Sequence, residues 1–285
     1  MKTLQIGFKA FDAHELLCHF VASAAGLYER ENLAVELVDI TFMTDADLPS
    51  GLFQASCGAA LSSALQGSQQ RIVFVATVNP MFWIYGRKEI REIKELAGLA
   101  KSKVATFPPI APPHHLANMV LTKAGLEVGG DVTLHPARDD VARLGLLKSG
   151  SVDAAVISSA VAPPRVEQLG FNTLAFIGDE IQLPTTGLAI DQPYLDKEPA
   201  VVQSLVKVLK EGLGLIHADP ELVAAVLENI FDVNPDLSQR TAALYQGYYT
   251  RDGKASAQVA QSAIASLAKA LSIAETPAWD DLYLF

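Results

Sequence analysis

The chain has 285 residues, of which 50% are apolar and 19% are charged, a composition typical of a globular protein. This length suffices for one large domain or for two domains of ordinary size, each with its own core. Acidic side chains outnumber basic ones by 32 to 22, which gives a net charge of −10 with the histidines neutral. Because such a surface repels polyanions, we expect no nucleic-acid partner.

The two cysteines, Cys18 and Cys57, lie in apolar stretches and lack the spacing of a metal or redox motif. We expect them to be buried, and we expect no disulfide, no metal and no other cofactor. The longest apolar run, 72–86, is shorter than a membrane span and contains Asn79 and Pro80, so we expect no direct insertion into a membrane.

The beginning of the sequence bears on where the protein works. Residues 1–7 form an alternating apolar segment without the apolar core and small-residue cleavage site of a secretory signal. If Met1 is the native start, this predicts a cytoplasmic protein. If a signal was removed ahead of Met1, the protein is expected in the periplasm or outside the cell.

Short β-branched runs alternate with helical periodicities, a pattern typical of an α/β protein with largely parallel sheets. Asp12 occupies the N-cap position of the first helix, which begins at residue 13. Strands are expected at 4–8, 34–39, 53–57, 71–77, 103–106, 132–135, 152–157 and 188–190, with further helices at 58–67, 112–124 and 139–148. A helical tail follows from residue 198, with the Asp-Pro and Asn-Pro pairs at 219 and 234 as helix starts.

Two β-rich connections, near 78–85 and 184–190, bracket the middle series of elements. We therefore expect one lobe from residues 1–82 and 188–285 and a second lobe from 83–187, joined by two crossovers. Ligands of α/β sheets bind at the C-terminal ends of strands. This organisation predicts a cleft between the lobes that closes around a small molecule.

Several segments carry a resemblance to a known family. They are GLYERENLAVELV at 26–38, KAGL and DVTL at 123–134, LKSGSVDAAV at 147–156 and LDKEP at 195–199. In order and spacing they resemble the nitrate/sulfonate/taurine-type, thiamine-pyrimidine-synthase-like, solute-binding proteins of ABC transporters. The resemblance implies the type 2 periplasmic-binding-protein fold, a small-molecule ligand, hinge closure and transport with an ABC permease as partner.

The same fold also serves intracellular enzymes, so fold alone does not decide function. The alternative is a decarboxylase, dehydratase or lyase that acts on a small organic acid, with His14, Asp12 and His114 as acid-base groups. The sequence has no G-x-S-x-G, H-E-x-x-H or Walker motif. A binding protein is therefore favoured over an enzyme.

The resemblance places ligand contacts in the loops after the strands. The first loop supplies Lys9, Phe11, Asp12 and His14, and the next strand end supplies Ser56 and Cys57. Phe11 either stacks on a planar ligand or fills a gap between loop and core. Asp12 and His14 have ordinary alternatives as a helix cap and a solvated side chain.

The segment 106–115 departs most from the family. The resemblance implies a hydroxyl-rich loop for sulfonate ligands where this chain has Ala-Pro-Pro at 111–113. Because proline has no N–H and alanine no hydroxyl, a sulfonate or nitrate ligand is disfavoured. Thr106, Phe107 and His114 instead favour a planar or aromatic ligand.

The remaining candidate contacts are hydroxyl groups. Ser158 and Ser159 stand where relatives carry Trp-Glu-Pro, and Thr185 and Thr186 lie at the return crossover. Each pair either forms hydrogen bonds with the ligand or has a structural role. For the serines this role is to end the strand, and for the threonines it is to form the hinge. Arg138 is a nearby basic candidate for a ligand carboxylate.

Overall fold

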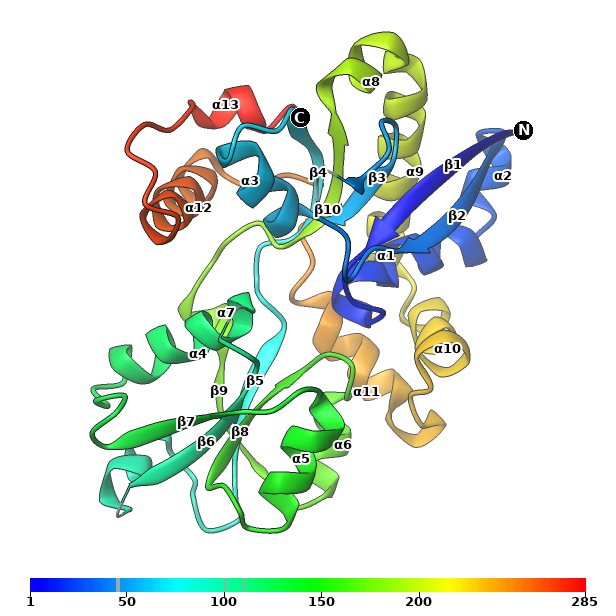
Figure 1. Cartoon of the computed structure of the whole chain (residues 1–285). Helices are drawn as coiled ribbons and strands as arrows, with labels where there is room; N and C mark the ends of the chain where they lie inside the picture. Colours follow the sequence, from blue (N-terminus) through cyan, green and yellow to red (C-terminus); the bar gives the residue numbers. More distant parts are fainter. Residues whose placement is uncertain (45–46, 100, 110) are drawn as a thin grey trace. The chain divides into compact units, whose positions relative to one another are not determined.

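The computed structural model describes residues 1–44, 47–99, 101–109 and 111–285. The chain forms two compact units (Figure 1). Unit 1 comprises Met1–Asn79 and Gln182–Phe285, and unit 2 comprises Pro80–Ile181. Each unit has its own sheet and its own helices.

Unit 1 is built on a five-stranded sheet, sheet A, with the order β2-β1-β3-β10-β4. Its strands are β1 (Lys2–Phe8), β2 (Leu33–Asp39), β3 (Phe53–Ser56), β4 (Gln70–Thr77) and β10 (Thr186–Asp191). β1 runs parallel to β2 and β3, and β10 is antiparallel to β3 and β4. The C-terminal ends of β1, β3 and β4 therefore share one edge with the beginning of β10.

Helices cover both faces of sheet A, with α3 and α12 on one side and α1 and α9 on the other (Figure 1). The helices of unit 1 are α1 (Ala13–Ala24), α2 (Leu27–Arg30), α3 (Cys57–Leu65), α8 (Gln192–Lys197), α9 (Pro199–Ala218), α10 (Pro220–Phe231), α11 (Pro235–Gln246), α12 (Ala257–Ala270) and α13 (Trp279–Leu282).

Helices α1 and α9 approach each other closely because a glycine lies at their contact. A Cβ atom on Gly212 would lie 3.0 Å from Ala22 Cβ and 3.1 Å from the Cys18 carbonyl oxygen. The Cys18 thiol donates to the Leu209 carbonyl at 3.3 Å. This contact fixes α1, whose N-terminal end carries several candidate ligand contacts.

The outer edge of β4 is covered by later parts of the chain. Val75 N–H donates to the Gly253 carbonyl at 2.8 Å, and Leu284 N–H donates to the Ile72 carbonyl at 2.8 Å. Tyr283 forms a parallel bridge with Ile72. These bonds satisfy backbone groups that an edge strand otherwise leaves open to pairing with another chain.

Unit 2 repeats the strand plan of unit 1. Its sheet, sheet B, has the order β7-β6-β8-β5-β9, again with an antiparallel strand in fourth place. The strands are β5 (Phe82–Gly86), β6 (Ser102–Thr106), β7 (Val132–Pro136), β8 (Ala154–Ser158) and β9 (Asn172–Phe176). The helices are the 3₁₀ helix η2 (Ile93–Gly98), α4 (Pro112–Lys123), α5 (Asp140–Lys148), α6 (Pro163–Gln168) and α7 (Ile177–Glu180).

The α/β class predicted from the sequence is confirmed, and so is the burial of Cys18 and Cys57. The predicted helix starts at Asp219 and Asn234 are also confirmed, since both side chains cap helices. The sequence did not predict β9, because a five-residue strand between short helices leaves no periodicity to read. Within the described ranges, no helix is long and apolar enough to cross a membrane.

Gly187 in β10 should tolerate no side chain. Its φ is +157°, and an added Cβ would lie 2.0 Å from the Phe74 carbonyl oxygen. We expect Gly187→Ala to lower the free energy of unfolding by about 3 kcal/mol or more, because backbone on two strands must separate. Chemical denaturation measures this.

Gly214→Ala is the matched control. Gly214 lies inside α9 with open space at its Cβ position, so alanine should raise the free energy of unfolding by about 0.5–1 kcal/mol. Equal effects at Gly214 and Gly187 would contradict the observed packing of β10 on β4.

Candidate functional site

One edge of sheet A gathers polar side chains from three strands. Ser56 ends β3, Thr77 ends β4 and Thr186 begins β10. In the strand register, Thr186 is the partner of both Ser56 and Thr77. Thr186 is buried, and Thr185, which precedes it in the chain, is partly exposed.

His14 joins this edge from the first turn of α1. Its Nε2 atom lies 3.1 Å from Thr77 Oγ1 and 2.9 Å from Thr185 Oγ1. Thr77 Oγ1 is in turn 2.7 Å from Thr185 Oγ1 and 2.8 Å from Thr186 Oγ1. The structure thus brings three predicted site residues, His14, Thr185 and Thr186, together with Thr77. We call these four residues the hydroxyl cluster.

Burial sets the charge of this cluster. His14 is 6% exposed, and desolvation lowers the pKa of its imidazole to about 3. The ring is therefore neutral at physiological pH. It can exchange hydrogen bonds with the hydroxyls, but its pKa is far from the value that suits a general base at neutral pH.

A buried carboxyl group holds the loop between β1 and α1. Glu15 accepts the N–H groups of Lys9 and Ala10 at 2.8 and 2.9 Å, and its own N–H donates to Asp12 Oδ1 at 3.0 Å. Asp12 is thus the N-cap of α1, as predicted. Desolvation raises the pKa of Glu15 to about 8, although its two N–H donors and Lys9 act in the opposite direction.

Lys9 bonds a neighbouring loop. Its ammonium group donates to the carbonyls of Ile40 and Met43 at 2.9 and 2.8 Å, and its own carbonyl accepts from Thr41 Oγ1 at 2.9 Å. These bonds fasten the loop after β1 to the loop after β2. The ammonium group of Lys9 therefore already has a structural role in unit 1.

Phe11 packs on neighbouring rings, and stacking on a ligand stays a prediction. Its ring packs against Phe8, Phe20 and Phe231, with centroid separations of 5.7, 5.8 and 5.9 Å. The residue is nevertheless 52% exposed. Three aromatic neighbours thus hold one side of Phe11 in place while much of the ring remains open, an arrangement we call the Phe11 platform.

Ser56 and Cys57 lie at the same strand end but differ in access. Ser56 caps α3 by accepting the Ala59 N–H at 3.4 Å. Cys57 is fully buried, and its thiol lies 3.5 Å from the Phe74 carbonyl oxygen. Burial raises the pKa of the Cys57 thiol, so it behaves as a small apolar core residue.

In unit 2, Thr106 and Phe107 lie at the end of β6. Thr106 is fully buried, and no described residue pairs with its hydroxyl oxygen. The Phe107 ring has the Arg143 guanidinium 3.5 Å from its centroid and the Phe82 ring 5.4 Å away, edge to face. Phe107 is therefore held between a cation and a second aromatic ring.

His114 lies in the first turn of α4, with Nδ1 3.1 Å from the Phe107 carbonyl oxygen. The N-cap of α4 is Ala111, which makes no side-chain cap bond, and two prolines open the helix. Proline lacks an N–H, so this helix end has lost two of its donors and the usual cap hydroxyl. This matches the sequence-based expectation of a weak oxyanion cradle.

Ser158 at the end of β8 is bonded to the start of α5. Its N–H donates to Asp140 Oδ1 at 2.9 Å and its hydroxyl donates to Asp140 Oδ2 at 2.6 Å. Asp140 also accepts from Arg143 at 2.7 Å. Ser159 follows and is 5% exposed. The hydroxyl of Ser158 is thus already engaged within unit 2.

Sequence reasoning missed four of these residues: Thr77, Glu15, Asp140 and Arg143. The acid-to-base spacing of three between Asp140 and Arg143 on a helix was a usable signal. Arg138, the basic candidate from the sequence, has a side chain that is 92% exposed and paired with Asp139. Among the residues that the structure describes, no three His, Cys, Asp or Glu side chains are grouped to hold a metal ion.

Comparison with solved structures identifies the fold. The aliphatic sulphonate binding protein SsuA from Escherichia coli is 18% identical, with a TM-score of 0.75 over 99% of this chain and 92% of that chain. A ligand binding component of an ABC-type import system from Staphylococcus aureus, with zinc bound, is 16% identical, with a TM-score of 0.75 over 99% and 96%. The desulfurization enzyme DSZB is 13% identical, with a TM-score of 0.70 over 100% and 96%. The chain therefore has the two-lobe, type 2 periplasmic-binding-protein fold.

Residues 14–222 match the family model described as NMT1/THI5 like, and the chain belongs to this family. The family resemblance found in the sequence is thereby confirmed. Comparison with curated protein sequences found no significant match.

Three buried groups on α1 predict how stability depends on pH. Glu15 has a pKa near 8 in the folded chain against an ordinary 4.5, so stability falls as pH rises between these values. His14 and His19 have lowered pKa values of about 3 and 4 against an ordinary 6.5, so their contribution rises with pH up to 6.5. Below pH 6.5, the stability gained with rising pH from His14 and His19 exceeds the stability lost from Glu15. Above pH 6.5, only the loss from Glu15 continues. We therefore expect maximal stability near pH 6.5.

Urea denaturation from pH 5 to 9 measures this profile. Glu15→Gln should flatten the decline between pH 6.5 and 8 and make the rise between pH 5 and 6.5 steeper, because the opposing contribution of Glu15 is removed from both intervals. A wild-type midpoint that keeps rising up to pH 8.5 would show that Glu15 is ionised in the folded chain.

Arg143→Met should destabilise unit 2. Arg143 donates to the carbonyls of Val156 and Ala137 at 2.7 and 3.1 Å, besides its bond to Asp140. Its loss removes one donor from each of the two carbonyls and from Asp140, which then keeps only its two hydrogen bonds from Ser158, and this costs about 3–5 kcal/mol for a buried pair. Arg138→Met is the exposed control, expected within about 0.5 kcal/mol of wild type. Comparable losses in thermal or urea denaturation would contradict this ranking.

Proposed function

We propose that this chain is the solute-binding component of an ABC-type import system and that it binds a small organic molecule with a planar, aromatic part. The observation that carries the ligand class is the Phe11 platform. A ring that is 52% exposed yet held by three phenylalanines presents a pre-positioned apolar face at the end of sheet A. Covering such a face is favourable and costs little ordering entropy.

Family membership and fold support the transport role. The similar structures include a protein named as the ligand binding component of an ABC-type import system and the sulphonate-binding SsuA. The chain shares their fold over 99% of its length. This role requires an ABC permease as partner and places the protein outside the cytoplasmic membrane, which fractionation of cells that express the native gene tests.

The hydroxyl cluster supplies polar contacts next to the platform. His14 follows Phe11 by three residues, and its neighbour Thr185 is partly exposed. Neutral imidazole and hydroxyl groups both donate and accept hydrogen bonds, so they suit carbonyl, ring-nitrogen or hydroxyl groups of a ligand. In unit 2 we propose contacts from Thr106, Phe107, His114 and the serine pair Ser158 and Ser159.

The start of α4 argues against a sulphonate or nitrate ligand. Two prolines and an alanine replace donors at a helix end that would otherwise favour an oxyanion. Lys9 is bonded to two carbonyls, and Arg143 is bonded to three acceptors. The cations near both strand ends are thus already used within their own units.

The alternative, an enzyme acting on an organic acid, depends on acid-base groups. The buried, neutral His14 and the helix-capping Asp12 are poorly suited to that work, which is why we favour binding. DSZB shares the fold and is named an enzyme, so the experiment must separate the two functions.

The test is a thermal-shift screen of aromatic acids, pyrimidines, amines and sulphonates, followed by titration calorimetry of the best compound. A ligand of the folded state raises the melting temperature by mass action. We expect a planar aromatic compound to rank first and to be recovered unchanged after long incubation. Consumption of the compound would establish the enzyme instead.

Phe11→Ala should weaken this compound at least tenfold, since it removes the covered aromatic face. Phe285→Ala, a change of the same size at a residue 37% exposed elsewhere in unit 1, is the control and should bind normally. Unchanged affinity in Phe11→Ala, or a sulphonate as the best ligand, would overturn the proposed ligand class.

A further inference from the structure

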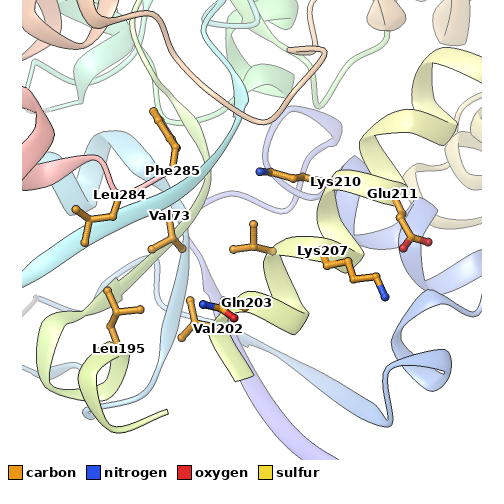
Figure 2. Close-up of a pocket in the computed structure, with 10 residues that line it drawn as sticks. Val73, Leu195, Val202, Gln203, Lys207, Lys210, Glu211, Leu284 and Phe285 are labelled. Carbon is orange, nitrogen blue, oxygen red and sulfur yellow. The ribbon is translucent and has the colours of Figure 1, made fainter. Parts of the chain in front are cut away.

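Unit 1 contains a groove that the proposed function does not use. It is an open groove of about 590 Å³ between α9, α8, β4 and the C-terminal residues (Figure 2). Its volume falls within the range of about 300–1,000 Å³ typical of small-molecule sites. None of its lining residues belongs to the hydroxyl cluster or the Phe11 platform.

The floor and walls of this groove are apolar. Val73 and Val202 at its floor are 5% and 3% exposed, whereas Leu284 and Phe285 are 36% and 37% exposed. The C-terminal pair is held against β4 by the backbone bond from Leu284 to Ile72. The groove is therefore bounded on one side by strand-paired residues and on the other by the rigid helix α9.

Two polar groups of α9 are directed into the groove. Figure 2 shows the ammonium group of Lys210 and the amide of Gln203 extending from the helix toward Val73. Among the described residues, neither side chain has a hydrogen bond or ion pair. The other charged residues of the lining are paired: Lys207 with Glu31 at 2.5 Å, and Glu211 with Arg30. Lys210 is thus an available cation on a chain of net charge −10.

We propose that this groove binds an amphipathic monocarboxylate, of the kind represented by a medium-chain fatty acid. The carboxylate pairs with the Lys210 ammonium, and the alkyl chain covers Val73, Val202 and Leu284, with the Gln203 amide about two helical turns away along α9. Charge complementarity favours an anionic head, and the apolar walls favour a hydrocarbon tail. The site is independent of the strand-end ligand.

Calorimetric titration of the full chain with decanoate tests this site. We expect saturable binding of one decanoate, and weaker binding of decanol and decylammonium by about tenfold or more. Lys210→Met should weaken decanoate about tenfold, the ratio that corresponds to one charge-assisted hydrogen bond. Lys207→Met is the matched control on the same helix, and because its ammonium is paired with Glu31 it should bind decanoate as wild type does.

A second variant tests the apolar wall. Leu284→Glu places a carboxylate at an exposed position of the groove and should abolish decanoate binding without loss of helical circular dichroism. Phe11→Ala should retain decanoate binding, which separates this site from the proposed transport ligand. The proposal is overturned if decanoate does not saturate, if Lys210→Met binds as wild type does, or if Phe11→Ala removes binding.

Discussion

The insertion of β10 between β3 and β4 is the constraint on which the polar end of unit 1 depends. β10 returns after the whole of unit 2 and pairs antiparallel with both neighbours. At the beginning of β10, Thr185 and Thr186 lie beside Thr77, from which they are separated by more than 100 positions in the sequence. Gly187 makes the close approach to β4 possible. Without β10, His14 would lack the hydroxyl of Thr185, at the second crossover, as a hydrogen-bond partner.

Burial of polar groups gives this strand end its rigidity. His14 and Glu15 lie side by side in sequence at the start of α1, and both are buried. Each is held near neutrality by desolvation, and each satisfies hydrogen bonds of its surroundings: His14 with hydroxyls, Glu15 with two backbone N–H groups of the loop. A loop fixed by a buried carboxyl loses little entropy when it meets a ligand. The half-open Phe11 lies in this loop.

The sequence predicted the order of strands and helices well, because apolar periodicity and caps such as Asp12 are local signals. The family resemblance places the ligand contacts at particular strand ends, which stays a prediction. Neither the local signals nor the family resemblance distinguished the side chains that are free to meet a ligand from those already bonded within the protein. Lys9 and Ser158 have the residue types of ligand contacts, yet the fold engages them with Ile40 and Asp140. Such pairings join loops that are far apart in sequence, so no local pattern reveals them.

Burial was equally hard to foresee for charged residues. An arginine next to an aspartate in a helical segment usually lies at the surface, and Arg138 does. Arg143, five residues later, is fully buried because three acceptors and the face of Phe107 surround its guanidinium. Arg138 directly precedes Asp139, whereas Arg143 lies three residues after Asp140. The spacing therefore indicates a helical pair, but only the packing of α5 on sheet B buries Arg143.

The two sheets share one strand order but present different chemistry at their C-terminal edges. Sheet A ends in hydroxyls and a neutral imidazole, and sheet B ends in aromatic rings with a guanidinium stacked on Phe107. The edge of sheet A thus offers hydrogen-bond donors and acceptors, and the edge of sheet B offers flat apolar faces. The prolines at the start of α4 strengthen this conclusion, because they remove the donors that an oxyanion would need while leaving Phe107 and His114 in place.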